Sequence, residues 1–435
     1  MLPPLTQLIA YALPALPLAA LVLPVYVFLP SAYAQAGLPL ASIGIIILLA
    51  RLWDGVTDPL VGVLSDRTVT RFGRRKPWIA AGLPVTLLSL WFLMVPGDGV
   101  GPAYLLCWSF ALFLGWTMMI VPLTAWGAEL SGDYHQRTRI AGFREGATII
   151  GTVLALSLPF AAGVGAAGQE RDALRLLALC ILLLLPLFTV IALVAVPEYR
   201  VPSKPPLKFR RGMKVIFANG AFRKLIAAYL INGIANGLPA QLFLFFVQHM
   251  LNEGERAGLL LLSYFASGLL AVPLWLWLSG KYGKHVVWRW AMIWNIAWFL
   301  TVPLLGPGDF TAFLIVCVMT GLSLGADLIL PSAMQADVVD MDTARTGRAR
   351  AGLYFAFWGL ATKLATALAA LGLTVAGLFG FDAITGGTPA GQTALLILYA
   401  LVPVLFKIVA IALLWRWPID AATQAALRAR IAVRT

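Results

Sequence analysis

The chain has 435 residues, of which 60% are hydrophobic and 12% are charged. A soluble domain carries about 25% charged residues, so this composition excludes an ordinary soluble protein. The formal net charge is +13, but the Lys and Arg residues fall in short segments between apolar runs. That placement argues against a nucleic-acid partner.

Long apolar runs follow one another along the chain, each long enough to supply the roughly 20 helical residues that cross a hydrocarbon core. The sequence predicts twelve transmembrane helices, at 6–29, 40–64, 77–96, 103–128, 140–162, 174–196, 222–247, 257–280, 286–305, 311–336, 351–379 and 392–416. Prolines in or near the first span lack a backbone donor and are expected to bend it: Pro14, Pro17, Pro24 and Pro30.

The second predicted span carries three charged side chains on one helical face. Arg51 precedes Asp54 by three residues, Asp58 follows it by four, and Thr57 lies beside them. Two carboxylates at this spacing ionise together only at a high cost unless a cation lies between them. The face therefore predicts a site for Na+ or a shared proton. The alternative is that Arg51 neutralises one carboxylate and the group serves helix packing.

Basic residues alternate from one connection to the next. They occur at 67–76, 137–139, 200–214, 281–289, 345–350 and 428–434, and the intervening connections contain almost none. By the positive-inside rule the basic connections and both termini are cytoplasmic. We therefore expect a multi-pass protein of a bacterial inner membrane. Cys107, Cys180 and Cys317 all fall in apolar runs and are interpreted as small core residues.

The longest basic connection divides the predicted spans into six and six. We expect an N-terminal bundle at 1–197, a cytoplasmic linker at 198–221, a C-terminal bundle at 222–417 and a cytoplasmic tail at 418–435. The segment PLVGVLSDRTVTRFGRRK from Pro59 has a weaker counterpart, PLWLWLSGKYGKH from Pro273. Repeated halves of this kind build two bundles around a central site in many transporters.

Other charged residues lie in or near later spans. Asp327 is expected to contact either the substrate or a neighbouring helix, Lys363 to pair with a carboxylate of the second span, and Lys407 to serve packing or the interface. Charges at predicted cytoplasmic helix ends form a candidate gate, with ordinary anchoring as the alternative. Its members are Glu129, Arg137, Asp337, Asp340 and Arg348.

These residues resemble the glycoside-pentoside-hexuronide:cation symporters of the major facilitator superfamily, to which melibiose permease belongs. The resemblance is strongest in ARLWDGVTDPLVGVLSDRTVTRFGRRKPW from Ala50 and continues in ADVVDMDTARTGRARAGLYFAFWGLATK from Ala336. Weaker segments are VPLTAWGAELSGDYHQRTRIAGFRE from Val121 and LVPVLF from Leu401. It implies an all-α membrane protein with the major facilitator fold: twelve transmembrane helices in two six-helix bundles around a central cavity.

The resemblance also implies roles for individual residues. A cation site falls on Asp54, Asp58, Thr57 and Thr117, with Arg51 and Lys363 beside it; Asp54 and Asp58 would hold Na+ if sodium is the coupling ion. Sugar recognition transfers less well. The helix I and helix IV aspartates of melibiose permease correspond here to the region of Leu18 and Ala19 and to Ile120, and only the helix V arginine remains, as Arg144. Asp327 and Thr124 complete the candidate substrate set.

We therefore expect a secondary active transporter that couples symport of a small solute to Na+ or H+ by alternating access. A sugar or glycoside is the first expectation. The alternatives are an amphiphile such as a lysolipid, an organic anion drawn to Arg144 and Lys363, or a non-transporting assembly factor or sensor on the same fold. His135, His249 and His285 are scattered, so no enzyme and no cofactor besides the coupling ion is predicted. We expect a monomer whose partners are its substrate and the bilayer.

Overall fold

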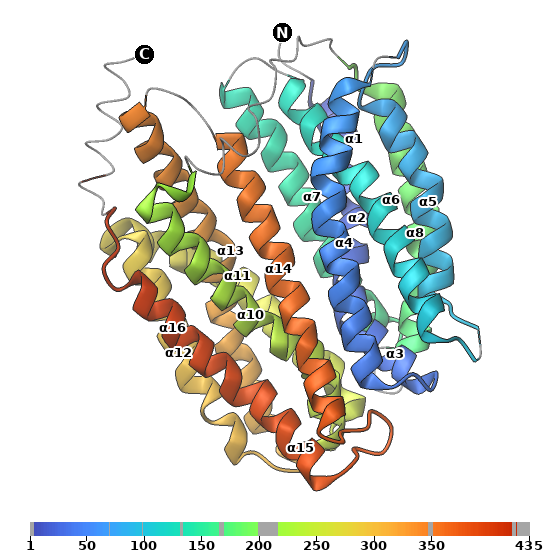
Figure 1. Ribbon diagram of the computed structural model, residues 1–435, viewed down its shortest axis with the longest axis vertical. Coiled ribbons are helices and arrows are strands. Elements are labelled where there is room, and N and C mark those ends of the chain that lie inside the picture. Colours follow the sequence, from blue (N-terminus) through green and yellow to red (C-terminus); the bar gives the residue numbers. More distant parts are fainter. Residues whose placement is uncertain are drawn as a thin grey trace. The chain divides into compact units, whose positions relative to one another are not determined.

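The computed structural model describes residues 4–68, 70–97, 99–130, 134–164, 169–198, 216–346, 351–419 and 423. Within these ranges the regular structure is helical, apart from an isolated β-bridge between Thr70 and Gly73 (Figure 1). The expected all-α class is confirmed for this part of the chain.

The chain divides into two compact units. The first comprises Met1–Lys204, Gly254–Gly258 and Leu373–Gly391, and the second comprises Pro205–Glu253, Leu259–Gly372 and Gln392–Thr435. Most of the predicted linker at 198–221 and of the predicted tail at 418–435 lies outside the described residues. The predicted domain boundaries therefore stay predictions.

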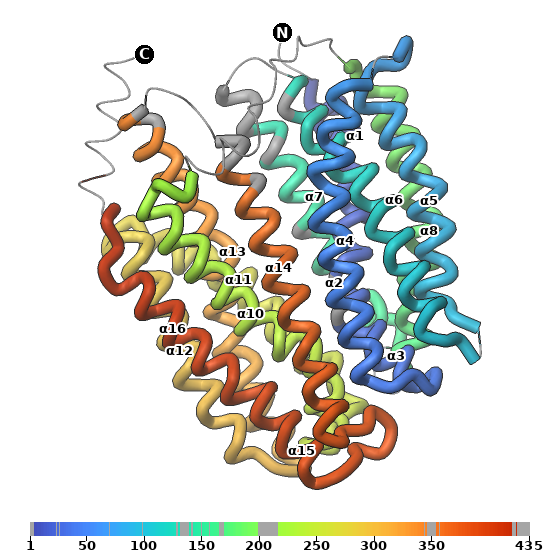
Figure 2. The backbone as a smooth tube through the Cα atoms, viewed as in Figure 1, coloured from blue at the N-terminus to red at the C-terminus, as the bar shows by residue number. Residues whose placement is uncertain are grey.

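Eight helices of the described residues up to 198 lie in the first unit, and successive long helices such as α4, α5 and α6 run in alternate directions (Figure 2). Their bounds are α1 Leu5–Ala12, α2 Ala15–Val27, α3 Leu29–Gln35, α4 Leu40–Arg67, α5 Lys76–Met94, α6 Pro102–Glu129, α7 Tyr134–Ala161 and α8 Glu170–Ala195.

The later helices belong wholly or mainly to the second unit, except for the short η1, which is grouped with the first. Their bounds are α10 Gly220–His249, η1 Gly254–Arg256, α11 Ala257–Tyr282, α12 Lys284–Phe299, η2 Val302–Leu304, α13 Phe310–Thr346, α14 Ala351–Leu378, α15 Pro389–Leu396, η3 Ile397–Leu401 and α16 Val402–Leu414.

The first predicted span is broken into α1 and α2, as its prolines predict, and the short α3 follows at its end. α1 ends at Ala12 and α2 begins at Ala15, directly after Pro14. α3 begins at Leu29 with Pro30 in its first turn. Because proline has no backbone N–H, the helical hydrogen-bond ladder is interrupted at these points.

Ten helical segments among the described residues are long and apolar enough to cross a membrane, so the chain is a multi-pass integral membrane protein. The predicted count of twelve is not confirmed. The span at 140–162 falls in α7, whose first turns carry Arg139, Arg144 and Glu145. The span at 286–305 falls in α12, which ends at Phe299 after 16 residues.

Large apolar side chains are exposed on the outer helices. Leu183 and Val194 of α8 are 70% and 81% exposed, and Leu270 of α11 is 79% exposed. Apolar surface of this extent is a liability in water. In a bilayer it contacts lipid of the same polarity.

Candidate functional site

The charged face of α4 is buried within the first unit. Asp54 has no exposed surface, Arg51 is 5% exposed and Thr57 is 1% exposed, while Asp58 is partly buried. The Arg51 guanidinium donates from Nη1 to Asp54 Oδ2 at 3.3 Å. The predicted grouping of these residues on one helix face is therefore present, and the helix continues through Pro59 to Arg67.

Thr117 of α6 joins the two carboxylates of α4. Its Oγ1 lies 3.0 Å from Asp54 Oδ1 and 2.9 Å from Asp58 Oδ1. A threonine hydroxyl has one hydrogen and can make one full hydrogen bond as a donor. The second contact becomes a full hydrogen bond when the carboxyl oxygen itself holds a proton. A cation bound between the oxygens would replace that proton, so the geometry suits an exchangeable positive charge.

Thr57 and Phe113 are two further neighbours of this charged group, and the expected role of Thr57 toward a cation stays a prediction. The Thr57 hydroxyl donates to the Asp54 backbone carbonyl at 3.2 Å, so in this structure it serves its own helix. The Arg51 guanidinium lies 4.1 Å from the ring centre of Phe113 on α6. An apolar helix contains many aromatic residues, and the sequence carries no signal that selects Phe113.

Lys363 is on α14, in the part of that helix that belongs to the second unit. Its expected place beside the carboxylates of α4 stays a prediction. Among the described residues no group of three or more His, Cys, Asp or Glu side chains is placed to hold a metal ion. Na+ at Asp54 and Asp58 would therefore need further oxygen ligands, such as the Thr117 hydroxyl, because hard cations bind through oxygen.

Two substrate candidates of the first unit meet each other. The Arg144 guanidinium on α7 donates to the Thr124 hydroxyl on α6 and forms an ion pair with Glu145. The sequence placed Arg144 and Thr124 in the substrate set separately, and the structure brings them together. Ile120 of α6 is partly buried and Ala19 of α2 is buried.

Asp327 lies in a polar network inside the second unit. It accepts hydrogen bonds from Asn232 Nδ2 at 2.9 Å, Asn236 Nδ2 at 2.9 Å and Trp288 Nε1 at 2.7 Å. Of the two expectations for Asp327, contact with neighbouring helices is the one that the structure shows. Its role toward a substrate stays a prediction.

Lys407 of α16 completes this network. It is 1% exposed, and its Nζ donates to Asn232 Oδ1 at 2.9 Å and to Asn236 Oδ1 at 2.8 Å. The same Nζ lies 3.7 Å from Asp327 Oδ2. Of the two roles expected for Lys407, packing or the interface, the structure shows packing, because its ammonium is buried among polar groups. The sequence analysis did not single out Asn232 and Asn236 as members of this network, because an uncharged asparagine in an apolar helix gives no clear signal.

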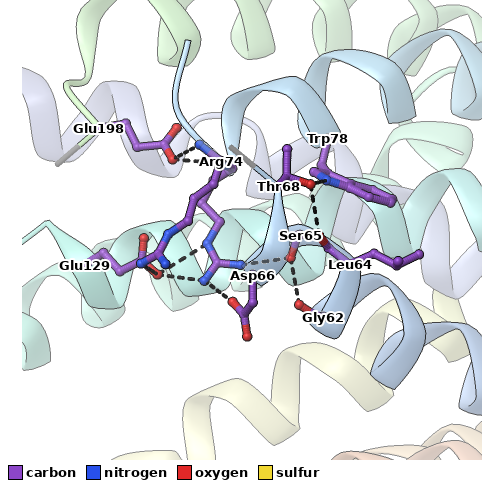
Figure 3. Close-up of polar contacts among 10 residues, drawn as sticks. Gly62, Leu64, Ser65, Asp66, Thr68, Arg74, Trp78, Glu129 and Glu198 are labelled. Atoms are coloured by element: carbon purple, nitrogen blue, oxygen red, sulfur yellow. Dashed lines mark hydrogen bonds and ion pairs between the residues drawn. The ribbon is translucent and has the colours of Figure 1, made fainter. Parts of the chain in front are cut away.

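Glu129, a predicted gate residue at the end of α6, binds the connection between α4 and α5 (Figure 3). Its carboxylate pairs with Arg74 at 3.1 Å and with Arg75 at 2.7 Å. Arg75 also donates to Ser65 Oγ at 2.8 Å and pairs with Asp66. Burial alone lowers the pKa of Arg75, but hydrogen bonds and charge from Glu129 and Asp66 outweigh burial and raise that pKa.

Glu198, which the sequence did not single out, caps the same connection (Figure 3). Its carboxylate accepts the backbone N–H groups of Arg74, Arg75 and Lys76 at 2.6, 2.8 and 3.1 Å. These groups open α5, where unpaired donors and the helix dipole favour an anion. Gly73 makes room for this approach, because a Cβ there would overlap the Glu198 carboxylate.

Two of the other predicted gate residues, Asp337 and Asp340, belong to the second unit. Asp337 of α13 binds Lys284 at the start of α12, with Nζ 2.8 Å from Oδ1 and 2.7 Å from Oδ2. Asp340 is partly buried on α13. Arg348 and the side chain of Arg137 lie outside the described residues.

Comparison with known proteins gives a family match over most of the chain. A family model described as MFS/sugar transport protein matches residues 10–421. The sodium-dependent lysophosphatidylcholine symporter 1 of Gallus gallus is 27% identical over 420 residues, covering 86% of this chain and 79% of the relative. The corresponding Homo sapiens protein is 25% identical over 419 residues, covering 87% and 76%. A sphingosine-1-phosphate transporter of Xenopus tropicalis is 24% identical over 419 residues, covering 87% and 81%.

Solved structures share the fold at low sequence identity. A D-xylose-proton symporter superposes with a TM-score of 0.65 at 14% identity, covering 96% of this chain and 97% of the other. The nucleoside transporter NupG superposes with a TM-score of 0.64 at 15% identity, covering 94% and 98%. These likenesses confirm the expected fold class. The finer resemblance to melibiose permease stays a prediction.

Proposed function

The chain belongs to the MFS/sugar transport protein family, and from that premise we propose that it is a sodium-coupled symporter of an amphiphile of the lysophospholipid type. As a member of this family it is a membrane transporter and not an enzyme. The proposal adds the coupling ion and the class of substrate.

The contact of Thr117 with both carboxylates of α4 carries the coupling part of the proposal. Thr117 Oγ1 lies 3.0 Å from Asp54 Oδ1 and 2.9 Å from Asp58 Oδ1 but carries a single hydrogen, so a proton or a metal cation would complete the group. Relatives named as sodium-dependent symporters favour Na+ over H+ in this position.

The substrate class rests on what the relatives transport and on what the candidate sugar site lacks. Two of the similar relatives are named for lysophosphatidylcholine and one for sphingosine-1-phosphate, each an acyl or alkyl chain with a polar head. Where melibiose permease has sugar-binding aspartates, this chain has apolar residues near Ala19 and at Ile120. A sugar needs several well-placed polar partners in its pocket. The loss of these acceptors favours an apolar chain over a sugar.

Ion binding at this site would couple to transport through the packing of α4 against α6. Arg51 pairs with Asp54, but the two carboxylates also meet at one hydroxyl in a low-dielectric environment, and their mutual repulsion disfavours the arrangement seen here. A bound Na+ removes that cost and favours the conformer in which α4 and α6 meet at Thr117. An ion with different affinities for two conformers shifts the equilibrium between them, which drives alternating access.

Glu129 and Asp337 each form ion pairs at the ends of helices within their own unit, which supports a structural role for both carboxylates. Each carboxylate binds basic residues of its own unit: Arg74 and Arg75 in the first, Lys284 in the second. We propose that these pairs brace the cytoplasmic helix ends while the units move. The cytoplasmic location of both termini rests on the alternation of basic connections and belongs to the same proposal.

Uptake into proteoliposomes tests the function. Labelled lysophosphatidylcholine is added outside, with inward Na+, H+ or no gradient, and albumin extraction removes lipid left in the outer leaflet. Uptake stimulated by the Na+ gradient is the expected result. Stimulation by the H+ gradient alone would overturn the assignment of Na+. Stimulated uptake of a labelled galactoside, with none of the lysolipid, would overturn the substrate class.

A further inference from the structure

A pocket of about 600 Å³ lies between the first helices of the chain and α7, within the first unit. This volume falls in the range of about 300–1,000 Å³ that small-molecule sites occupy. The lining residues are apolar with a single exception, which is an arginine: Ile9, Ala12, Leu13, Leu16, Arg139, Gly142, Phe143, Gly146, Ala147 and Ile150.

The sequence explains why the helices separate here. At one end Gly151 of α7 packs directly against the backbone of Leu16, so close that a Cβ would overlap it. Toward the start of α7, Gly142 and Gly146 have open space where a Cβ would stand. On the other side the chain breaks at Pro14 between α1 and α2. The helices therefore touch at Gly151 and move apart toward the start of α7. The space between them stays open because Gly142 and Gly146 have no side chains to fill it.

The charge in this pocket has no acidic partner in the described part of the chain. Arg139 is exposed, and the nearest aromatic contact of its guanidinium is Phe143, with a ring centre 5.9 Å away. Its neighbour Arg144, by contrast, is engaged by Thr124 and Glu145. An arginine fork with unused donors suits an oxyanion such as phosphate.

The pocket is charged at one end and apolar along the rest, which matches a molecule with a charged head and an apolar chain. Arg139 is the first of the α7 residues that line the pocket, and Ile150, about 16 Å farther along the helix axis, is the last. The basic end is the one that the positive-inside rule assigns to the cytoplasmic surface, where lipid headgroups lie.

We propose that this pocket binds a single-chain amphiphile with a phosphate head, the phosphate on Arg139 and the chain along Gly142, Gly146 and Ile9. The inference rests in part on the proposed function, because it makes the pocket a docking site for the transported class on the cytoplasmic side. It concerns α1, α2 and α7 and is independent of the carboxylates on α4.

Photo-crosslinking of the full-length protein in nanodiscs tests the proposal. The probe is a lysophosphatidic acid that carries a diazirine on its acyl chain, and labelled peptides are mapped by mass spectrometry. We expect labels in residues 9–16 and 142–150, and competition by unlabelled lysophosphatidic acid. Labels confined to other helices would overturn the proposal, as would equal competition by a two-chain phosphatidic acid.

Two variants separate the head from the chain. Arg139→Gln is expected to reduce labelling by the phosphate probe about tenfold and to leave labelling by a diazirine monoacylglycerol unchanged. Gly146→Leu fills the pocket and is expected to reduce labelling by both probes. The matched controls are Arg175→Gln, an exposed arginine of α8, and Gly280→Leu, a helical glycine of α11 with open space around it. Loss of labelling in a control to the same extent would overturn the proposal.

The same assay distinguishes this site from the function on which it rests. The Asp58→Asn protein is expected to label as the wild type does, because the pocket does not include α4. If the wild type labels as expected but shows no cation-stimulated uptake, the proposed function fails and the site stands. If uptake is stimulated by sodium but neither variant changes the labelling, the site fails and the function stands.

Discussion

In the first unit a pair of carboxylates on α4 shares one threonine hydroxyl, whereas in the second unit a single carboxylate on α13 faces donors from three helices. Asp327 accepts from Asn232, Asn236 and Trp288, and Lys407 supplies the balancing charge. All of these partners are donors, which matches the hydrogen-bonding capacity of a carboxylate that only accepts. The hydroxyl of Thr117 cannot serve Asp54 and Asp58 in full at the same time. Buried charge therefore stabilises a bundle in one unit and suits an exchangeable ion in the other.

Removing one partner from the second unit's network is expected to have the largest effect on stability. Lys407→Met leaves Asp327 without its balancing charge, and loss of one member of a buried pair costs about 3–5 kcal/mol of unfolding free energy. Thermal unfolding in detergent measures the loss. The control is Lys281→Met at the end of α11, where an exposed lysine lies over the rings of Trp277 and Tyr282 and a change within about 1 kcal/mol is expected.

A double variant shows whether the two charges act as a pair. Asp327→Asn combined with Lys407→Met removes both charges, and we expect it to unfold at a higher temperature than Lys407→Met alone. Simple addition of the two single losses would contradict the network as described, because coupled residues give non-additive effects.

The proposed ion site of the first unit is expected to respond differently, with loss of coupling and retention of fold. Asp58→Asn keeps the shape of the side chain but removes one negative charge, so the cation loses a ligand. Gradient-driven accumulation should fall by about 100-fold, near the upper end of typical coupling energies. Uptake and thermal unfolding are measured on the same preparation, with Asp172→Asn, an exposed carboxylate of α8, as the control. Unchanged accumulation in Asp58→Asn would remove the coupling assignment.

Thr117 offers a finer test of the same site. Thr117→Ser keeps the hydroxyl, while Thr117→Val keeps the shape and removes it. Sodium stimulation should fall roughly tenfold in the valine variant and change little in the serine variant, because the oxygen and not the methyl group meets the carboxylates. Equal stimulation in both variants would show that the hydroxyl is no part of the ion site.

The grouping of charged residues could be predicted from the sequence in the first unit but not in the second. Asp54, Asp58 and Arg51 lie within eight residues on one helix, so helical periodicity alone places them on one face. The partners of Asp327 come from residues 232, 236, 288 and 407. No local pattern joins positions so far apart, and Asn and Trp carry no charge that would draw attention within an apolar helix.

In the fold, too, features set by neighbouring residues were predictable, whereas contacts between residues far apart in the chain were not. Apolar runs foretold the long helices, and the prolines foretold the breaks in the first span. The cap of α5 by Glu198 was not foretold, because it joins residues 122–124 positions apart in the chain. The short length of α12 was also missed, since its break at Phe299 follows apolar residues without a proline until Pro303.

The corner that follows α4 in the first unit and the corner that follows α11 in the second allow a last comparison of the two units. Gly73 and Gly283 occupy equivalent aromatic-Gly-basic corners, and both have a positive φ, of 103° and 89°. Alanine at either position carries the strain of that conformation, about 1–2 kcal/mol. At Gly73 the new Cβ would also overlap the Glu198 carboxylate, whereas at Gly283 the nearest atom, on His285, is 3.8 Å away.

Gly73→Ala should therefore lower the unfolding temperature more than Gly283→Ala does. The difference should shrink when Glu198→Ala is present in both backgrounds, because the clash is then gone. An equal loss of unfolding temperature in the two single variants would mean that the Glu198 side chain moves away from the new Cβ without loss of stability. The first unit would then hold the corner at Gly73 no more tightly than the second unit holds the corner at Gly283, where Lys284 pairs with Asp337.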